Sequence, residues 1–200
     1  MAKLARLARA LNPAARLPPL ILLTDDVRLP DPFAVAAGLP RGCAVILRHR
    51  DQAARTALAQ RLRKITHEHD VLLLISQDAR LARAVGADGL HLPERLAGTA
   101  AHWKTLRPNW FVTAAAHSAA SLAAAARARA DAVLLAPVFP TRSHPERASL
   151  GVLRASNMAR QIPVPVYALG GVNCRIATRL TGSSFAGIAA IEGLAGTHSR

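Results

Sequence analysis

A chain of 200 residues with 51% hydrophobic side chains is long enough to bury one full core, so we expect a single globular domain. The formal net charge of +14 and the pI of about 11.6 would suit an anionic partner. However, the arginines are spread along helix patterns and aromatic residues make up only 4% of the chain, which argues against nucleic acid as the main partner.

The sequence contains no run that is long and apolar enough to span a membrane. The two cysteines, Cys43 and Cys174, lie far apart and do not have the spacing of metal ligands. We therefore expect reduced thiols in a cytoplasmic protein, without a disulfide framework or a zinc site.

The first 19 residues form a basic extension. The stretch Met1–Leu17 is amphipathic and contains no acidic residue, which predicts a short helix packed on the domain. A transit peptide has a similar composition and stays an alternative, whereas the cleavage site and long apolar centre of a secretory signal are missing. Pro18 and Pro19 end this segment, so we divide the chain into a helical extension, 1–19, and a main domain, 20–200.

Short apolar runs alternate with helix-forming stretches in the main domain. Strands are expected at 20–24, 43–47, 70–75, 88–92, 110–115, 131–136, 165–169 and 185–191. Helices are expected near 33–37, at 52–67, up to 85, at 102–107, up to 128, at 150–161 and at 173–180. Continuous apolar runs are typical of parallel strands that are covered on both faces.

Eight such units predict an α/β protein with a single small (β/α)₈ TIM barrel, whose last helix is truncated or missing. An open, doubly wound sheet is the alternative. No glycine-rich turn follows the first strand, as a dinucleotide site in such a sheet would require.

Polar residues follow nearly every expected strand, although the strands themselves are apolar. In a barrel, functional groups collect where the strands end and the following loops begin, so we expect a ligand site there. These positions are Thr24, Arg48, Arg50, Ser76, Gln77, Asp78, His91, Glu94, His117, Thr141, Arg142, Ser143, His144, Gly170, Gly171 and Glu192.

The clearest signal is the stretch Asp131–His144, in which a buried strand runs into a loop punctuated by prolines. The loop residues 141–144, TRSH, combine hydroxyls that donate to phosphate oxygens with a guanidinium that binds them in a two-pronged fashion. This composition predicts an anion cradle, and a rigid polar surface loop is the alternative interpretation. Gly170 and Gly171 end a later strand, where small residues let backbone amides approach a phosphate.

Six segments of the chain share the order and spacing of one enzyme family. They are VILRHR at 45–50, LLLISQD at 72–78, GADGLHL at 86–92, AAAHS at 114–118, ADAVLLAPVFPTRSH at 130–144 and PVYALGGV at 165–172. In these segments the chain resembles the thiamine phosphate synthase and TenI-like family of small (β/α)₈ barrels. The resemblance covers most of residues 20–192.

The resemblance implies a transferase of thiamine biosynthesis. Such an enzyme joins 4-amino-2-methyl-5-pyrimidinylmethyl diphosphate to a thiazole phosphate, and pyrophosphate leaves with the help of Mg²⁺. The implied partners are therefore two small phosphorylated substrates, and a homodimer is the expected assembly.

The resemblance also assigns roles to individual residues. It implies pyrophosphate contacts from Arg48, Arg50, Thr141 and Ser143, and thiazole phosphate contacts from Gly170 and Gly171. We add His91 and His144 to the predicted phosphate contacts, and Arg48 and His117 are the predicted catalytic residues. A structural imidazole at His91 and a helix-capping role for His117 are the alternatives.

The two magnesium-binding motifs of the family are not matched. Ser76–Gln77 stands where the first motif has Asn–Asp, and residues 93–96, PERL, stand where the second has GQxD. Because Mg²⁺ prefers carboxylates together with phosphate oxygens, Asp78 and Glu94 are the predicted metal ligands in their place.

Three functional hypotheses follow from these departures. The first is a divergent synthase that binds its metal differently or uses cations such as Arg95 or Arg142 to assist the leaving group. The second is a TenI-like thiazole phosphate isomerase (tautomerase); the family histidine for this reaction falls near Pro137, so His117 or His144 would have to replace it. The third is a non-catalytic barrel that binds a phosphorylated ligand.

Overall fold

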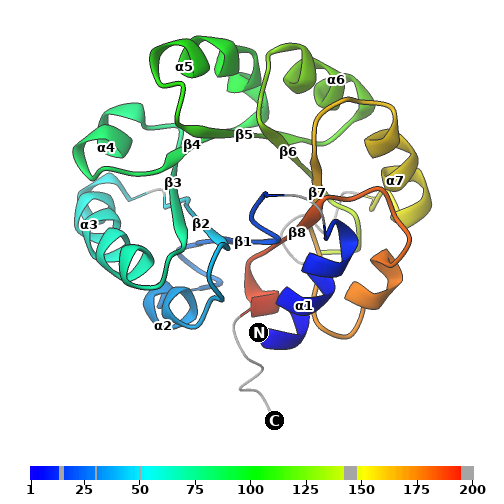
Figure 1. Ribbon diagram of the computed structural model, residues 1–200, viewed down its shortest axis with the longest axis horizontal. Helices are drawn as coiled ribbons and strands as arrows, with labels where there is room; N and C mark the ends of the chain where they lie inside the picture. The colour runs from blue at the N-terminus through cyan, green and yellow to red at the C-terminus, as the bar shows by residue number, and fades with distance from the viewer. Residues whose placement is uncertain (14–15, 30, 50, 142–147, 195–200) are drawn as a thin grey trace.

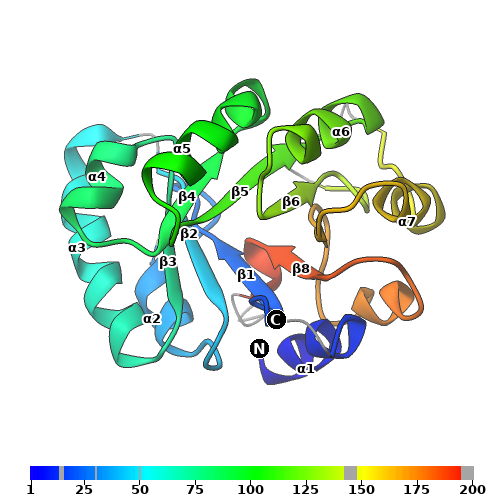
Figure 2. The ribbon, with the colours of Figure 1, turned by 45° about the horizontal axis from the view of Figure 1, so that its top comes forward.

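The computed structural model describes residues 1–13, 16–29, 31–49, 51–141 and 148–194. Eight parallel strands pair in chain order and close into a ring, with the helices outside it (Figures 1 and 2). They are β1 (Leu20–Leu23), β2 (Ala44–Leu47), β3 (Leu72–Ser76), β4 (Gly89–Leu92), β5 (Phe111–Ala116), β6 (Ala132–Leu135), β7 (Val166–Ala168) and β8 (Gly187–Ala190). The predicted (β/α)₈ barrel is confirmed.

The helices follow the predicted order, with differences after β4 and β7. The α-helices are α1 (Ala2–Leu11), α2 (Pro32–Ala37), α3 (Gln52–Glu68), α4 (Ala79–Ala84), α5 (Ala100–Leu106), α6 (Ala119–Arg127) and α7 (Val152–Arg160). The 3₁₀ helices are η1 (Glu94–Thr99), η2 (Ala177–Leu180) and η3 (Glu192–Leu194). Within the described residues, η3 is the element that follows β8.

The helix predicted over 173–180 is wrong in its length. The side chain of Asn173 accepts hydrogen bonds from the backbone N–H groups of Arg175 (2.9 Å) and Ile176 (3.3 Å). These bonds form a turn over 174–176, and the helical part is limited to the four-residue η2 that follows it. The other difference is η1, which the prediction missed because Pro93 suggested only the end of a strand.

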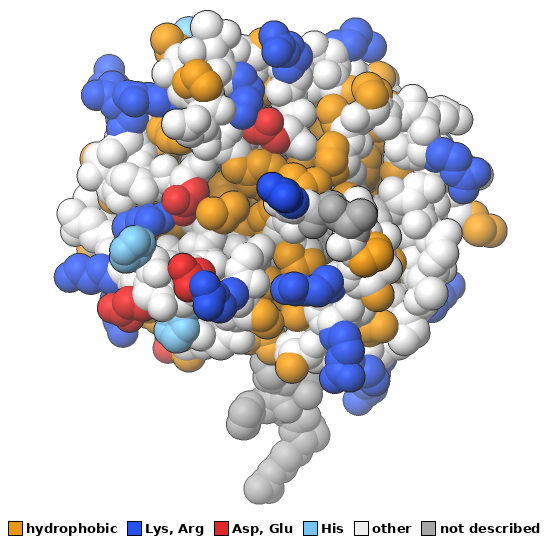
Figure 3. Space-filling view, viewed as in Figure 1, with side chains coloured by type: hydrophobic (Ala, Val, Ile, Leu, Met, Phe, Trp, Pro, Cys, Tyr) orange, Lys and Arg blue, Asp and Glu red, His pale blue; other side chains and the backbone are white. Residues whose placement is uncertain are grey.

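The basic N-terminal segment forms α1 and packs on the barrel, as predicted. Its apolar face buries Leu4, Ala5 and Ala8, and it contacts β1, β8 and η2. Figure 1 shows α1 lying against the ring beside β1 and β8. On the face of the molecule seen in Figure 3, Lys and Arg side chains lie around the rim and also over the middle of the face.

Side chains alternate between the interior of the barrel and the layer beneath the helices. The buried side chains that face the interior are mostly apolar. They are Ile21, Leu23, Ala44, Ile46, Leu74, Ala132, Leu134, Tyr167 and Ala189. Continuing this alternation past the ends of β1 and β2 brings Asp25 and Arg48 to the inward-facing side at the mouth of the barrel, and His91 is an inward-facing residue of β4 itself. The floor below them is filled, so a ligand can bind only at the mouth.

No helix among the described residues is long and apolar enough to cross a membrane. Both cysteines are free thiols; Cys43 is buried and Cys174 is partly buried. Burial raises the pKa of the Cys43 thiol to about 11, so this cysteine stays protonated and packs as a small apolar residue.

Tyr167 fastens the floor of the barrel to the segment that precedes β1. Its buried hydroxyl donates to the carbonyl oxygen of Pro18 at 2.7 Å. We expect Tyr167→Phe to lower the free energy of unfolding by about 1–2 kcal/mol, because it removes this bond and leaves a buried carbonyl unpaired. Urea unfolding measures the change. The control is Thr105→Val, which removes an exposed hydroxyl from α5 and should change stability by less than about 0.5 kcal/mol. Equal effects of the two substitutions would contradict the role of Tyr167.

Candidate active site

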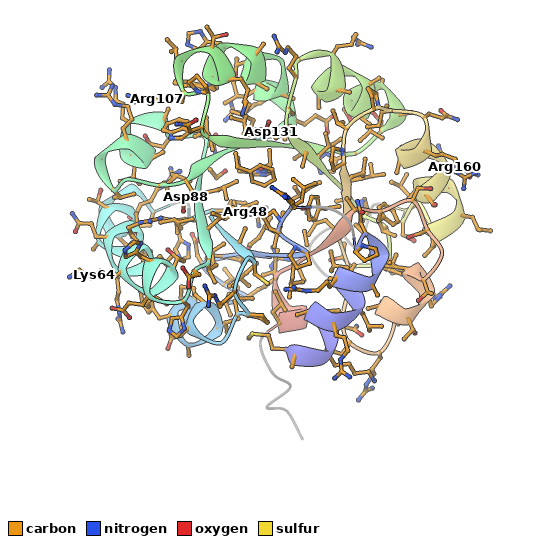
Figure 4. All side chains as sticks on the ribbon, in the orientation of Figure 1. Arg48, Lys64, Asp88, Arg107, Asp131 and Arg160 are labelled. Carbon is orange, nitrogen blue, oxygen red and sulfur yellow. The ribbon has the colours of Figure 1, made fainter. Side chains whose placement is uncertain are left out.

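Arg48 extends from the end of β2 over the mouth of the barrel. Its backbone N–H donates to Oγ1 of Thr24 at 3.0 Å, and its Nη2 donates to Oδ2 of Asp25 at 2.7 Å. Figure 4 shows Arg48 inside the ring of strands in projection, whereas Lys64 and Arg160 lie at the outer rim. The predicted phosphate-binding guanidinium therefore stands at the mouth, partly exposed to solvent.

Asp25 is the carboxylate that orients this guanidinium. Besides Arg48 it binds Arg28, whose Nη2 lies 2.6 Å from its Oδ2. Burial by itself would raise the pKa of Asp25, but the hydrogen bonds and charge of Arg28, together with the bond from Arg48, hold that pKa well below its usual range. Thr24 is among the site positions expected from the sequence, but Asp25, the residue that follows it, is not. The period-2 alternation that continues past Leu23 is the signal that could have found it.

His91 lies within the barrel and not on its exposed rim. The ring is 4% exposed, and its Nδ1 lies 2.9 Å from Oγ1 of Thr113 on the neighbouring strand. Burial, and then the positive charge of Arg48, lowers the pKa of His91 to about 3. The ring is therefore neutral at neutral pH. These surroundings suit the structural interpretation of His91 better than the predicted phosphate contact, which would favour a protonated ring.

A side-chain bridge joins the loops after β3 and β4. The guanidinium of Arg95 donates to Oε1 of Gln77, and the backbone N–H of Gln77 donates to the carbonyl oxygen of His91 at 2.9 Å. Gln77 adopts φ +54°, a left-handed conformation that costs free energy for a residue with a Cβ. An arginine held by a neutral amide thus stands where the resemblance implies a metal-binding motif.

The two predicted metal ligands have other partners. Asp78 is the N-cap of α4, and its Oδ1 accepts the backbone N–H of Leu81 at 2.9 Å. Glu94 forms an ion pair with Nδ1 of His117. Among the described residues there is no group of three or more His, Cys, Asp or Glu side chains that could hold a metal ion. The carboxylates present therefore do not fit a protein-held magnesium centre.

The Glu94–His117 pair connects the loops that follow β4 and β5, and lines a cavity of about 420 Å³. Pro137, Ala148 and Leu150 form the other walls of this cavity. The capping role considered for His117 belongs to Ser118 instead, which forms a capping box at the start of α6.

Gly170 and Gly171 lie against the loop that follows β6. They adopt φ +92° and φ +68°, values that favour glycine. A Cβ added to Gly170 would lie 2.8 Å from Cα of Pro137. One added to Gly171 would lie 2.3 Å from the carbonyl oxygen of Pro140, the residue before Thr141. The glycines therefore allow the two loops to touch.

Several predicted residues cannot be placed. Arg50, Arg142, Ser143 and His144 lie outside the described residues. Their assignments as phosphate contacts stay predictions.

Arg55 is a cation near the mouth that sequence reasoning missed. It projects from α3, is 8% exposed, and donates to the carbonyl oxygen of Ser76 at the end of β3. Its Nε has no hydrogen-bond partner among the described residues. No local signal marks this residue, because arginines are common on all the helices.

Asp88 and Asp131 lie at the opposite ends of the strands, away from the mouth. Oδ2 of Asp88 accepts the backbone N–H of Leu73 at 2.8 Å, and Oδ2 of Asp131 accepts that of Val112 at 2.7 Å. Figure 4 shows both aspartates beside the strands. They fasten neighbouring strands together and are not part of the mouth.

The lowered pKa of His91 predicts a pH-dependent stability. Between the usual histidine pKa of 6.5 and the value of about 3 in the folded protein, the unfolded chain binds a proton that the folded protein does not. The free energy of unfolding should therefore fall as the pH drops through this range. We expect a weaker fall in His91→Asn, whose amide can still meet Thr113. Urea unfolding from about pH 7 to about pH 5 tests this, since Asp25, whose usual pKa of 3.8 is lowered further in the folded protein, loses its contribution only at lower pH. Parallel pH profiles for the two proteins would contradict it.

The chain matches a family model and several known proteins. The family model for thiamine monophosphate synthase matches residues 23–194. The thiamine-phosphate synthase of Alcanivorax borkumensis is 33% identical over 193 residues, which cover 92% of this chain and 88% of the relative. That of Chromobacterium violaceum is 31% identical over 175 residues, which cover 85% and 83%.

A solved structure, the thiamine phosphate pyrophosphorylase from Pyrococcus furiosus, has the same fold. It superposes with a TM-score of 0.73 at 23% identity, and the match covers 96% of this chain and 91% of that structure. The matched length, the identity of the curated relatives, which are transferases, and the common barrel together place the protein: the chain belongs to the thiamine monophosphate synthase family.

Proposed function

We propose that this protein is a thiamine phosphate synthase, which joins 4-amino-2-methyl-5-pyrimidinylmethyl diphosphate to a thiazole phosphate and releases pyrophosphate. The observation that carries the proposal is Arg48, a guanidinium fixed by Asp25 over the mouth of a barrel of this family. The two phosphorylated substrates are the partners in this proposal, and a homodimer and a cytoplasmic location stay predictions.

The reaction needs a leaving group whose charge is neutralised. The bond between the pyrimidine methylene carbon and the diphosphate oxygen breaks, and its electron pair leaves with the diphosphate. The lone pair of the thiazole nitrogen then forms the new C–N bond to the methylene carbon. A guanidinium held in place before the reaction stabilises the negative charge that develops on the leaving oxygen.

The residues at the mouth have separate roles in this reaction. Arg48 binds the diphosphate. Asp25 fixes the orientation of the guanidinium, so that little conformational entropy is lost when the substrate binds. The contact between the Thr141 loop and the two glycines brings backbone of two loops together, where the thiazole phosphate would be received.

In this proposal Mg²⁺ reaches the site already bound to the substrate. Because Asp78 and Glu94 have other partners, we propose that Mg²⁺ arrives as its complex with the diphosphate and is not held by a carboxylate pair of the protein. Arg95 supports this view, since among the described residues it pairs with the neutral Gln77 and with no carboxylate, which leaves its charge available to an anion.

An assay with both substrates tests the function. We expect the purified protein to form thiamine phosphate and pyrophosphate in equal amounts, and Arg48→Ala to lower kcat/KM by about 100-fold or more because the leaving group loses its cation. Lys64→Ala, which removes the same charge from the outer rim, is the control and should keep the wild-type rate.

Two results would contradict the proposal. Wild-type protein that binds the substrates but forms no thiamine phosphate would favour the non-catalytic barrel. Conversion of the thiazole phosphate to a tautomer, without any coupling to the pyrimidine, would favour the isomerase.

The capping role of Asp78 gives a second prediction. Asp78→Ala should lower the free energy of unfolding by about 1 kcal/mol through loss of the helix cap, whereas Asp78→Asn, which can still cap, should change it little. Neither variant should change the Mg²⁺ concentration that gives half-maximal activity. Chemical unfolding and a magnesium titration of the rate measure the two effects. A higher magnesium requirement in both variants would instead assign Asp78 to the metal.

A further inference from the structure

We propose that Glu94 contacts the aminopyrimidine ring and stabilises the positive charge that the ring acquires during the reaction, and that His117 is the positioning residue that holds Glu94 in place. This inference rests on the proposed function. It gives a role to an ion pair that neither the metal site nor the phosphate contacts require.

The carboxylate of Glu94 is fixed on two sides. Its own backbone begins η1, directly after β4, and its side chain pairs with the ring of His117 from the loop after β5. That loop is itself held, because the backbone N–H of His117 donates to Oγ of Ser121 at 3.0 Å in the first turn of α6. Glu94 and His117 are 40% and 37% exposed, so the pair is firmly placed but open to a ligand.

The cavity beside this pair has one polar wall and an apolar remainder. Glu94 and His117 form the polar wall, and Pro137 and Leu150 face them. The apolar walls are tied together, since the backbone N–H of Leu150 donates to the carbonyl oxygen of Pro137 at 2.9 Å. A volume of about 420 Å³ is within the usual range for small-ligand sites. Such a space suits a flat heteroaromatic ring that presents an amino group to the carboxylate.

The leaving group and the ring would then lie next to each other. Arg48 follows β2 and Glu94 follows β4, and only β3 lies between these two strands in the ring. Glu94 follows His91 by three residues on the same strand and loop. A substrate with its diphosphate on Arg48 can therefore direct its ring toward the cavity.

The carboxylate matters most while the bond breaks. The bound pyrimidine is neutral, but departure of the diphosphate leaves a cation that is delocalised onto the ring and its amino nitrogen. A carboxylate that accepts a hydrogen bond from this amino group gains attraction as the positive charge grows. An interaction that strengthens only at this stage raises kcat and has little effect on KM.

The substitution Glu94→Gln tests the charge, because it keeps the size of the side chain and an accepting oxygen. We expect kcat for thiamine phosphate formation to fall by about 100-fold while KM for the pyrimidine diphosphate changes by less than about threefold. Glu68→Gln, at the exposed end of α3, changes the net charge equally and is the control. A wild-type kcat in Glu94→Gln, or a raised KM at unchanged kcat, would overturn the inference.

A double-mutant cycle tests the role of His117. We expect His117→Asn to lower kcat by about 10-fold, because Glu94 keeps its charge but loses its fixed position. Adding His117→Asn to Glu94→Gln should then cost little further activity. Independent, multiplicative losses would show that His117 does not act through Glu94.

The activity of the wild-type protein in the same assay distinguishes a failure of the proposed role of Glu94 from a failure of the proposed function. If the wild type forms thiamine phosphate and Glu94→Gln is equally active, only the role of Glu94 is overturned. If the wild type forms none, the proposed function fails and this inference fails with it. Thermal unfolding of each variant verifies that any loss of activity occurs in folded protein.

Discussion

The pairing of β1 with β8 is the constraint on which the rest of the structure depends. Leu20, Ile21 and Leu22 pair in parallel register with Ile188, Ala189 and Ala190, and this register closes the ring. A closed ring has no unpaired strand edge and forces the carboxyl ends of all eight strands to meet at one mouth. Side chains that are far apart in sequence therefore become neighbours wherever their strands are neighbours. The bridges Gln77–Arg95 and Glu94–His117 both join loops that follow adjacent strands.

Most of the fold could be predicted from the sequence, because a strand that is buried on both faces consists almost entirely of apolar residues. Runs such as LILL at 20–23 and AVLL at 132–135 are apolar throughout, and both are strands in the structure. The local turn at Asn173 and the 3₁₀ helix after Pro93 were harder to predict. Each depends on a few hydrogen bonds between neighbouring residues, which the pattern of hydrophobic residues does not record.

The candidate site was predictable in outline only. The barrel fold fixes the location of the site at the mouth, and Arg48 lies at this predicted mouth. The partners of the charged side chains did not follow, because a carboxylate near a strand end can bind a metal, cap a helix or pair with a cation. Asp78 caps α4, Glu94 binds His117, and Asp25 binds two arginines. The distances between side chains decide among these roles, and a single sequence does not contain them.

Arg55 has a consequence for how the mouth responds to ionic strength. Attraction between an anion and exposed cations such as Arg95 weakens as salt is added, because mobile ions screen it. A guanidinium that is 8% exposed and pairs with a carbonyl oxygen is screened far less. Its field at the end of β3 therefore persists at salt concentrations that suppress the field of the surface arginines. The affinity of this mouth for anions should therefore fall less steeply with added salt than the net charge of +14 would suggest.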